Sequence, residues 1–127
     1  MEFEIMSEPK AQKRHRLCRG RVYDPSKKDK MSFLEAATRY KPDEPMEDPL
    51  AVTLTFFTKR PASHFNKSGL KKNARRFPPK PDIDNLCKFV FDALNGVFYK
   101  DDVQIVELHS RKLYGEMYKT VVKIETR

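Results

Sequence analysis

One amphipathic segment, residues 83–97, constrains the fold of this chain more than any other feature. Pro79 and Pro81 keep the chain extended before it, and Asn95-Gly96 is a typical helix stop. The pattern predicts a helix that starts near Asp84. Its apolar residues recur at the i, i+3, i+4, i+7 spacing of one helix face: Ile83, Leu86, Cys87, Val90, Phe91, Leu94 and Val97.

Shorter patterns on both sides of this helix predict a sheet and a second helix. Residues 2–6 and the alternating residues 50–57 favour strands, the second of them half-buried. A helix is expected from about Lys27 to Tyr40, with Ser26 as its N-cap. Residues 103–112 and 117–125 predict two more strands, the last antiparallel to the one before it. We expect an α+β (mixed α/β) fold, with a mixed sheet and two main helices packed on it.

Length and composition suit one small domain, residues 1–127. A chain of 14.9 kDa is long enough for one ordinary domain and too short for two. Two cysteines exclude both a disulfide framework and a four-cysteine zinc site. No stretch approaches the ~20 apolar residues of a membrane span, and no signal peptide is recognised. We therefore expect a cytoplasmic protein with no membrane partner.

The positive charge is concentrated in two strips that contain no acid. Residues 10–21, here called the basic arm, read as a loop or an irregular hairpin, and residues 59–80, the basic loop, read as a long mobile loop. Together they hold 14 of the 26 Lys and Arg residues, although the net charge of the whole chain is only +8. Two such strips favour a surface that binds a polyanion, most simply nucleic acid. The alternative is a solvated surface that keeps the protein soluble.

The residues expected to contact nucleic acid come from both strips. In the basic arm they are Lys13, Arg14, Arg16, Arg19 and Arg21. In the basic loop they are Lys71, Lys72, Arg75, Arg76 and Lys80.

Asp82 and Asp84 are the strongest candidates for metal ligands. In an extended segment, residues two apart point to the same side, so both carboxylates share one side if the helix starts near Asp84. Two carboxylates form a hard oxygen site suited to Mg²⁺ or Mn²⁺, and the helix dipole stabilises their charge. The alternative is a simple N-cap followed by weak helix-surface ion pairs of Lys88 with Asp84 and Asp92.

Asp101-Asp102 adds acids just after the helix stop. Because the connection is short, the following strand returns against its own helix, and we expect Asp102 to approach Asp82 and Asp84. Three acids and one lysine, Lys88, are what metal-dependent phosphodiester cleavage requires. The alternative is a polar turn.

Three segments together resemble a known family. Residues 80–88, 92–96 and 101–105 are similar to the signature of the RusA family of Holliday junction resolvases. The basic arm and the Tyr-Asp-Pro-Ser turn at residues 23–26 resemble that family more loosely.

The resemblance implies a homodimeric, Mg²⁺-dependent, structure-selective endodeoxyribonuclease of mixed α/β fold that acts on four-way DNA junctions. It implies Asp82, Asp84 and Asp102 as catalytic acids and metal ligands, and Lys88 as the catalytic lysine. Asp92 and Asp101 would be supporting residues. Mn²⁺ is expected to substitute for Mg²⁺, and the setting is the cytoplasm of a bacterial or phage-infected cell.

The sequence departs from the family at Pro81, where some members carry an arginine, so its phosphate contact falls to Lys80 or Arg76, or is absent. Two other functions stay open. One is a non-catalytic DNA-binding protein with structural acids, and the other is a metal nuclease that acts on RNA or on other branched DNA.

Overall fold

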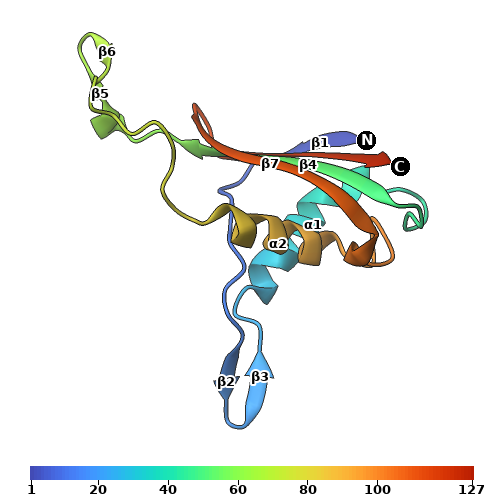
Figure 1. The fold of residues 1–127 in the computed structure, drawn as a ribbon. Coiled ribbons are helices and arrows are strands. Elements are labelled where there is room, and N and C mark those ends of the chain that lie inside the picture. Colours follow the sequence, from blue (N-terminus) through green and yellow to red (C-terminus); the bar gives the residue numbers. More distant parts are fainter.

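The structure, a computed structural model, describes residues 1–127 and is built on one mixed sheet of four strands (Figure 1). The strands are β1 (Glu2–Ile5), β4 (Leu50–Lys59), β7 (Ile105–Gly115) and β8 (Lys119–Thr126), in the spatial order β1-β8-β4-β7. β4 pairs in parallel with β7, whereas β8 pairs antiparallel with both β4 and β1. The predicted α+β class and mixed sheet are confirmed.

Two helices, α1 (Lys27–Ala37) and α2 (Ile83–Leu94), lie on the same side of this sheet (Figure 1). A short 3₁₀ turn, Thr38–Tyr40, continues α1 to the predicted end. α2 ends at Leu94, and Gly96 follows with a positive φ of 81°, which an L side chain rarely adopts. Both predicted helices are therefore confirmed, and Asn95-Gly96 is the helix stop.

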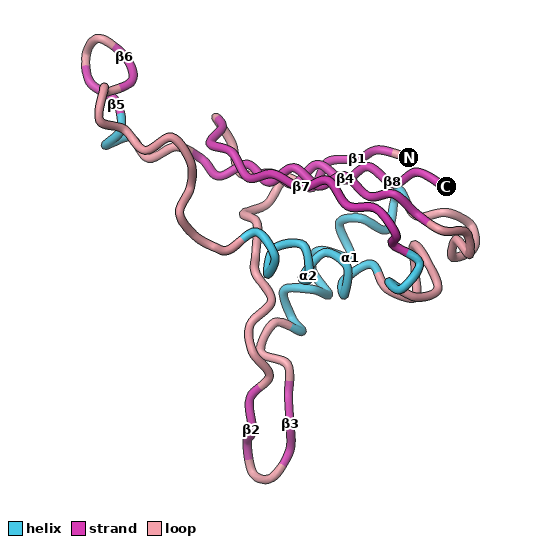
Figure 2. Tube along the Cα trace, in the orientation of Figure 1, coloured by secondary structure: helices cyan, strands magenta, loops and turns pink.

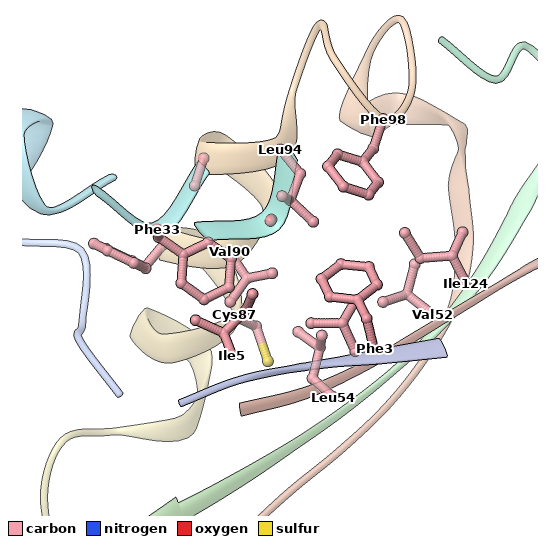
Figure 3. Packing of buried hydrophobic residues seen from close by; sticks show 14 of the residues in the cluster. Phe3, Ile5, Phe33, Val52, Leu54, Cys87, Val90, Leu94, Phe98 and Ile124 are labelled. Atoms are coloured by element: carbon pink, nitrogen blue, oxygen red, sulfur yellow. The ribbon is translucent and has the colours of Figure 1, made fainter. Parts of the chain in front are cut away.

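The core fills the space between the sheet and the two helices (Figure 3). Alternate residues of β4, among them Val52 and Leu54, face α2 and are almost fully buried. Phe33 of α1 packs edge-on against Phe89 of α2 at a centroid distance of 5.8 Å. The apolar stripe predicted from residue spacing is thus the face that α2 buries.

β4 is buried on both faces over much of its length, whereas the sequence predicted a half-buried strand. It is the only strand with neighbours of similar length on both sides, β7 and β8. Ala51 and Thr55, which point away from the helices, are also buried. Side chains of the two neighbouring strands surround them, which a single-strand pattern cannot reveal.

The last two strands run in opposite directions, as predicted, but they are not neighbours, because β4 lies between them. β7 also begins later than expected, at Ile105. Residues 102–104 form a 3₁₀ turn instead, which Asp101 caps by accepting a hydrogen bond from the Val103 backbone.

Two hairpins project from the body (Figure 2). The basic arm and the two residues after it form β2 (Arg16–Cys18) and β3 (Arg21–Tyr23), and the basic loop forms β5 (Phe65–Asn66) and β6 (Gly69–Leu70) after a 3₁₀ turn at Ala62–His64. The basic loop therefore contains more regular structure than predicted. No helix is both long and apolar enough to cross a membrane.

Truncating one leucine of the core should destabilise the protein strongly. Leu86 on α2 is 1% exposed, whereas Leu70 at the tip of the basic loop is 53% exposed. Leu86→Ala should lower the free energy of unfolding by about 2–5 kcal/mol, because it leaves a cavity as well as losing buried area. Leu70→Ala is the matched control and should change it by less than about 0.5 kcal/mol. Urea denaturation measures both, and equal effects would contradict this packing.

Candidate active site

The start of α2 carries the two acids that the sequence singled out. Asp82 is the N-cap residue, with an extended backbone (φ −66°, ψ 141°), and Asp84 lies in the first helical turn. The helix therefore begins at Ile83, one residue earlier than predicted. Both aspartates are exposed, and neither carboxylate forms an ion pair or a side-chain hydrogen bond. Their oxygens remain free for a ligand.

Two distant segments fix the chain at this point. Lys112 of β7 donates a hydrogen bond from its ammonium to the Pro81 carbonyl at 2.9 Å. The Gln12 backbone N–H, at the base of the basic arm, donates to the Asn85 carbonyl at 3.0 Å. The acid pair therefore sits where β7, the basic arm and the end of the basic loop meet.

A groove of about 430 Å³ runs beside Asp84 between α2 and β7. Lys88 lines it together with Asp84, and Leu108 of β7 forms its opposite wall. Cys87, at its floor, is a buried core thiol that donates a hydrogen bond to the Ser110 hydroxyl at 3.1 Å. Burial raises the pKa of this thiol, so it stays neutral.

Lys88 is exposed and forms no ion pair with Asp84 or Asp92. The alternative interpretation of two surface ion pairs along α2 is therefore wrong. Asp92 pairs instead with Lys30 of α1, at 3.3 Å. The Lys88 ammonium stays unneutralised one turn beyond Asp84.

Asp102 lies near the other end of α2. β7 returns antiparallel to the helix, so Ser110 and Lys112, late in the strand, reach the helix start, while Asp102, before the strand, stays near Asp92. A helix of 12 residues is about 18 Å long. The expectation that the short connection brings Asp102 to Asp82 and Asp84 is not met. No group of three or more His, Cys, Asp or Glu side chains is close enough to hold a metal ion.

The surroundings of Asp102 disfavour its charged form. Partial burial raises the pKa of this carboxyl, and so do the neighbouring Asp101 and the charge of Asp92. Asp101 itself acts as a cap, and Gln104 completes that capping box by accepting from the Asp101 N–H at 2.8 Å. Gln104 also donates to the Met46 and Asp48 carbonyls, which anchors the start of β7.

The donors present fit a hard divalent cation. Mg²⁺ is usually held by one or two carboxylates, and water or substrate phosphate supplies the remaining oxygens. Asp82 and Asp84 provide two unpaired carboxylates at a helix N-terminus, in contact with solvent.

The predicted DNA-contacting residues are exposed in both projections, and every one of the ten is free of an ion pair. Arg60, which the sequence analysis did not single out, orders the basic loop. Its guanidinium lies 4.1 Å from the centre of the Tyr114 ring and donates to the Arg75 carbonyl at 2.8 Å.

Lys30 was also missed. Its ammonium bridges Asp24, at 2.6 Å, and Asp92, at 3.3 Å, and the lysine side chain is only 14% exposed. No spacing in the sequence relates residues 24, 30 and 92. Burial alone would raise the pKa of Asp24, but hydrogen bonds from Lys30, Gln12 and the Ser26 backbone outweigh it and lower the pKa to about 2. Ser26 occupies the predicted N-cap position without capping α1 through its side chain, because its hydroxyl accepts from the Lys13 N–H at 2.9 Å.

Free carboxylates at a helix start, an unpaired lysine one turn away and two acid-free basic projections are the features of a nuclease that uses a divalent metal. The chain belongs to the RusA endodeoxyribonuclease family, whose model matches residues 5–125. It is also 34% identical to YqaN, an uncharacterized protein of Bacillus subtilis (strain 168), over 98% of this chain and 94% of that protein. The chain is therefore an endodeoxyribonuclease, a hydrolase of a family that acts on branched DNA junctions and depends on divalent metal ions.

The Asp24–Lys30 pair predicts a loss of stability in acid. Because the folded-state pKa of Asp24 is lowered from 3.8 to about 2, its contribution to stability is complete above pH 3.8. That contribution is lost as the pH falls through 2, when the folded carboxyl takes up a proton. Asp24→Asn should be less stable than the wild type at pH 7, and its loss of stability between pH 4 and pH 2 should be smaller. Urea midpoints across this range measure the difference, and parallel curves for the two proteins would contradict it.

Proposed function

We propose that this protein is a Mg²⁺-dependent Holliday junction resolvase that works as a homodimer and makes paired nicks in four-way DNA, with Mn²⁺ able to replace Mg²⁺. One observation carries the proposal. The unpaired carboxylates of Asp82 and Asp84 stand at the start of α2, where the two acid-free basic projections meet the body. In this proposal residues 1–127 form one nuclease domain, and the role is in DNA recombination and repair.

Asp82 and Asp84 hold the metal ion at the helix start. A bound divalent cation neutralises charge on the scissile phosphate and activates the attacking water. Without a cation the two carboxylates repel the DNA backbone, so their position beside basic segments has little purpose in a protein that only binds DNA. The free acid pair therefore favours a nuclease over a protein that only binds DNA.

Lys88 stabilises the negative charge that develops on the phosphate. Its ammonium is exposed and shares a groove with Asp84, and no carboxylate neutralises it. A fixed positive charge beside a developing negative one lowers the barrier most where water is partly excluded.

Asp102, Asp92 and Asp101 act from the other end of α2. The family resemblance supports Asp102 as the third catalytic acid. Asp101 and Asp92 hold the surrounding structure in place. Asp101 caps the turn that holds Asp102, and Asp92 is fixed by Lys30. Because Asp102 is separated from the acid pair, its role can be tested by metal binding. Loss of a metal ligand weakens metal binding, whereas loss of a residue that acts at a distance leaves it unchanged.

A nicking assay tests the function. Matched four-way, fork, duplex and single-stranded DNA substrates, together with RNA, are incubated with the protein in Mg²⁺ and in EDTA. Paired nicks confined to the four-way junction and dependent on Mg²⁺ support the proposal. Metal-dependent cutting of RNA or forks alone would favour the broader nuclease, and junction binding with no cutting in Mg²⁺ would favour the non-catalytic protein.

The acid pair should be required for cleavage but not for binding. Asp82→Asn and Asp84→Asn should each abolish nicking, because each removes a charged metal ligand, while junction affinity is retained through the basic residues. Asp43→Asn, an exposed acid in the linker before β4, is the matched control and should keep full activity. Asp102→Asn should also abolish nicking. Calorimetric Mn²⁺ titration then shows whether Asp102 acts as a ligand, and near wild-type nicking by any of the three would remove its role.

Lys88→Ala should slow the chemical step. The rate at saturating junction should fall by about 10²–10³, as is typical for the loss of one electrostatic contact in the transition state, with little change in affinity. Lys41→Ala, an exposed lysine after α1, serves as the control. Normal turnover with weakened binding would make Lys88 an ordinary phosphate contact.

The active species should be a homodimer. A four-way junction has two-fold symmetry, and a chain with one acid pair supplies one cut, so a two-fold dimer matches the substrate. Sedimentation should find a dimer at working concentration. Mixed wild-type and Asp84→Asn subunits should give heterodimers that nick one strand only, and paired nicks by a monomer would contradict this.

A further inference from the structure

We propose that the β2–β3 hairpin is an apolar wedge that inserts Leu17 and Val22 between base pairs at the branch point of the DNA. The inference rests on the proposed function, because a branch point is a feature of that substrate. It adds an element that recognises DNA structure, separate from the acids that cut and from the arginines that bind phosphate.

The two side chains form one exposed apolar patch. Leu17 and Val22 are direct cross-strand partners in the hairpin and therefore point to the same face. They are 72% and 71% exposed, and no other part of the chain covers them. Single exposed aliphatic residues are common on protein surfaces. A paired patch on a two-stranded projection that stands away from the body, as Figure 1 shows, calls for a partner.

The opposite face of the same hairpin is polar and basic. Arg16 pairs with Tyr23, and Cys18 pairs with Arg21. The turn is two residues long, Arg19-Gly20, with φ values of 52° and 75° at its central positions. Positive φ at both positions is typical of the tight type I′ turn, which makes a narrow hairpin end. The projection is thus thin, with an aliphatic face and a basic face.

The charge of the arm identifies the partner as DNA. Residues 10–21 carry Lys and Arg and no acid, so the aliphatic pair can approach a phosphate backbone without repulsion. Proteins that kink DNA insert aliphatic side chains between base steps, while arginine and lysine hold the adjacent backbone. Outside residues 10–21 and 59–80 the chain carries 12 basic and 18 acidic residues. The alternative partner is therefore this acidic body in a second copy of the chain, and the experiment below separates the two.

A branch point favours such an insertion over an intact duplex. Unstacking costs least where pairing or stacking is already interrupted. The same aliphatic pair therefore gains more from a junction than from continuous duplex, which gives selectivity without contacts to particular bases.

The base of the arm is fixed to the helix that carries the acids. The Gln12 side chain donates to Asp24 at 2.9 Å, and its backbone N–H donates to Asn85 on α2. Lys30 joins Asp24 to Asp92, also on α2. The hairpin and the acid pair thus share one support, so a wedge seated in the branch point places the neighbouring strand at a set position relative to Asp82 and Asp84.

The test uses the double variant Leu17→Ser/Val22→Ser. Affinity is measured in EDTA on a four-way junction and on matched duplex, and 2-aminopurine at the branch point reports unstacking by its fluorescence. Burial of one aliphatic side chain is worth about tenfold to a hundredfold in affinity, so junction affinity should fall at least about tenfold and the fluorescence rise should disappear. Duplex affinity and its salt dependence should stay unchanged.

Three controls accompany the double variant. Leu70→Ser, at a leucine that is 53% exposed on the other projection, should leave every measurement unchanged. Arg16→Ala/Arg21→Ala should flatten the salt dependence on both DNAs by up to about two units, since each phosphate contact contributes about 0.9. Val22→Thr is nearly isosteric and should weaken junction binding in the same direction, so the test survives if the double variant folds poorly.

Equal losses on junction and duplex, or no loss on either, would overturn the wedge. If the double variant sediments as a monomer while the fluorescence rise persists, the hairpin is a subunit contact instead. A wild-type protein that unstacks the branch point but cuts no DNA in Mg²⁺ would support the wedge and refute the proposed Mg²⁺-dependent resolvase. The two failures are therefore distinguishable.

Discussion

The arrangement of this molecule depends on the two ion pairs that the Lys30 ammonium makes. Lys30 lies between Asp24, just after the β2–β3 hairpin, and Asp92, on α2, with only 14% of its side chain exposed. A partly buried charge with two opposite partners is costly to break from one side, because the remaining charges then lack compensation. One lysine therefore holds three elements together: the arm, α1 and the helix that carries the acid pair.

α2 joins the core to the chemistry. One face of this helix contributes Leu86, Phe89 and Val90 to the packed interior, so the helix cannot shift without opening the core. Its first turn is held by the Lys112 and Gln12 hydrogen bonds. Rigid placement matters at a nuclease site, because small displacements of a catalytic group cost much of the rate.

Electrostatics divides the molecule into two kinds of surface. The two projections carry cations without acids, and the start of α2 carries acids without partners. DNA is attracted by the first and repelled by the second unless a divalent cation intervenes. Such a division makes binding and cutting separable, which is why the acid substitutions are expected to spare affinity.

The sequence by itself determined the two main helices, the approximate positions of the four sheet strands and the acid pair, because these depend on local rules. Spacing defined α2, Gly96 ended it, and Asp82 and Asp84 are neighbours along the chain, so no fold is needed to bring them together. The two basic strips were equally plain. Only the tertiary structure decided that β4 separates β7 from β8 and that Asp102 lies near the far end of α2. It alone brought Lys30 to Asp24 and Asp92. These contacts join residues that are distant in the sequence. They depend on the direction in which a strand returns and on how the layers pack, and the spacing of residues within one segment encodes neither.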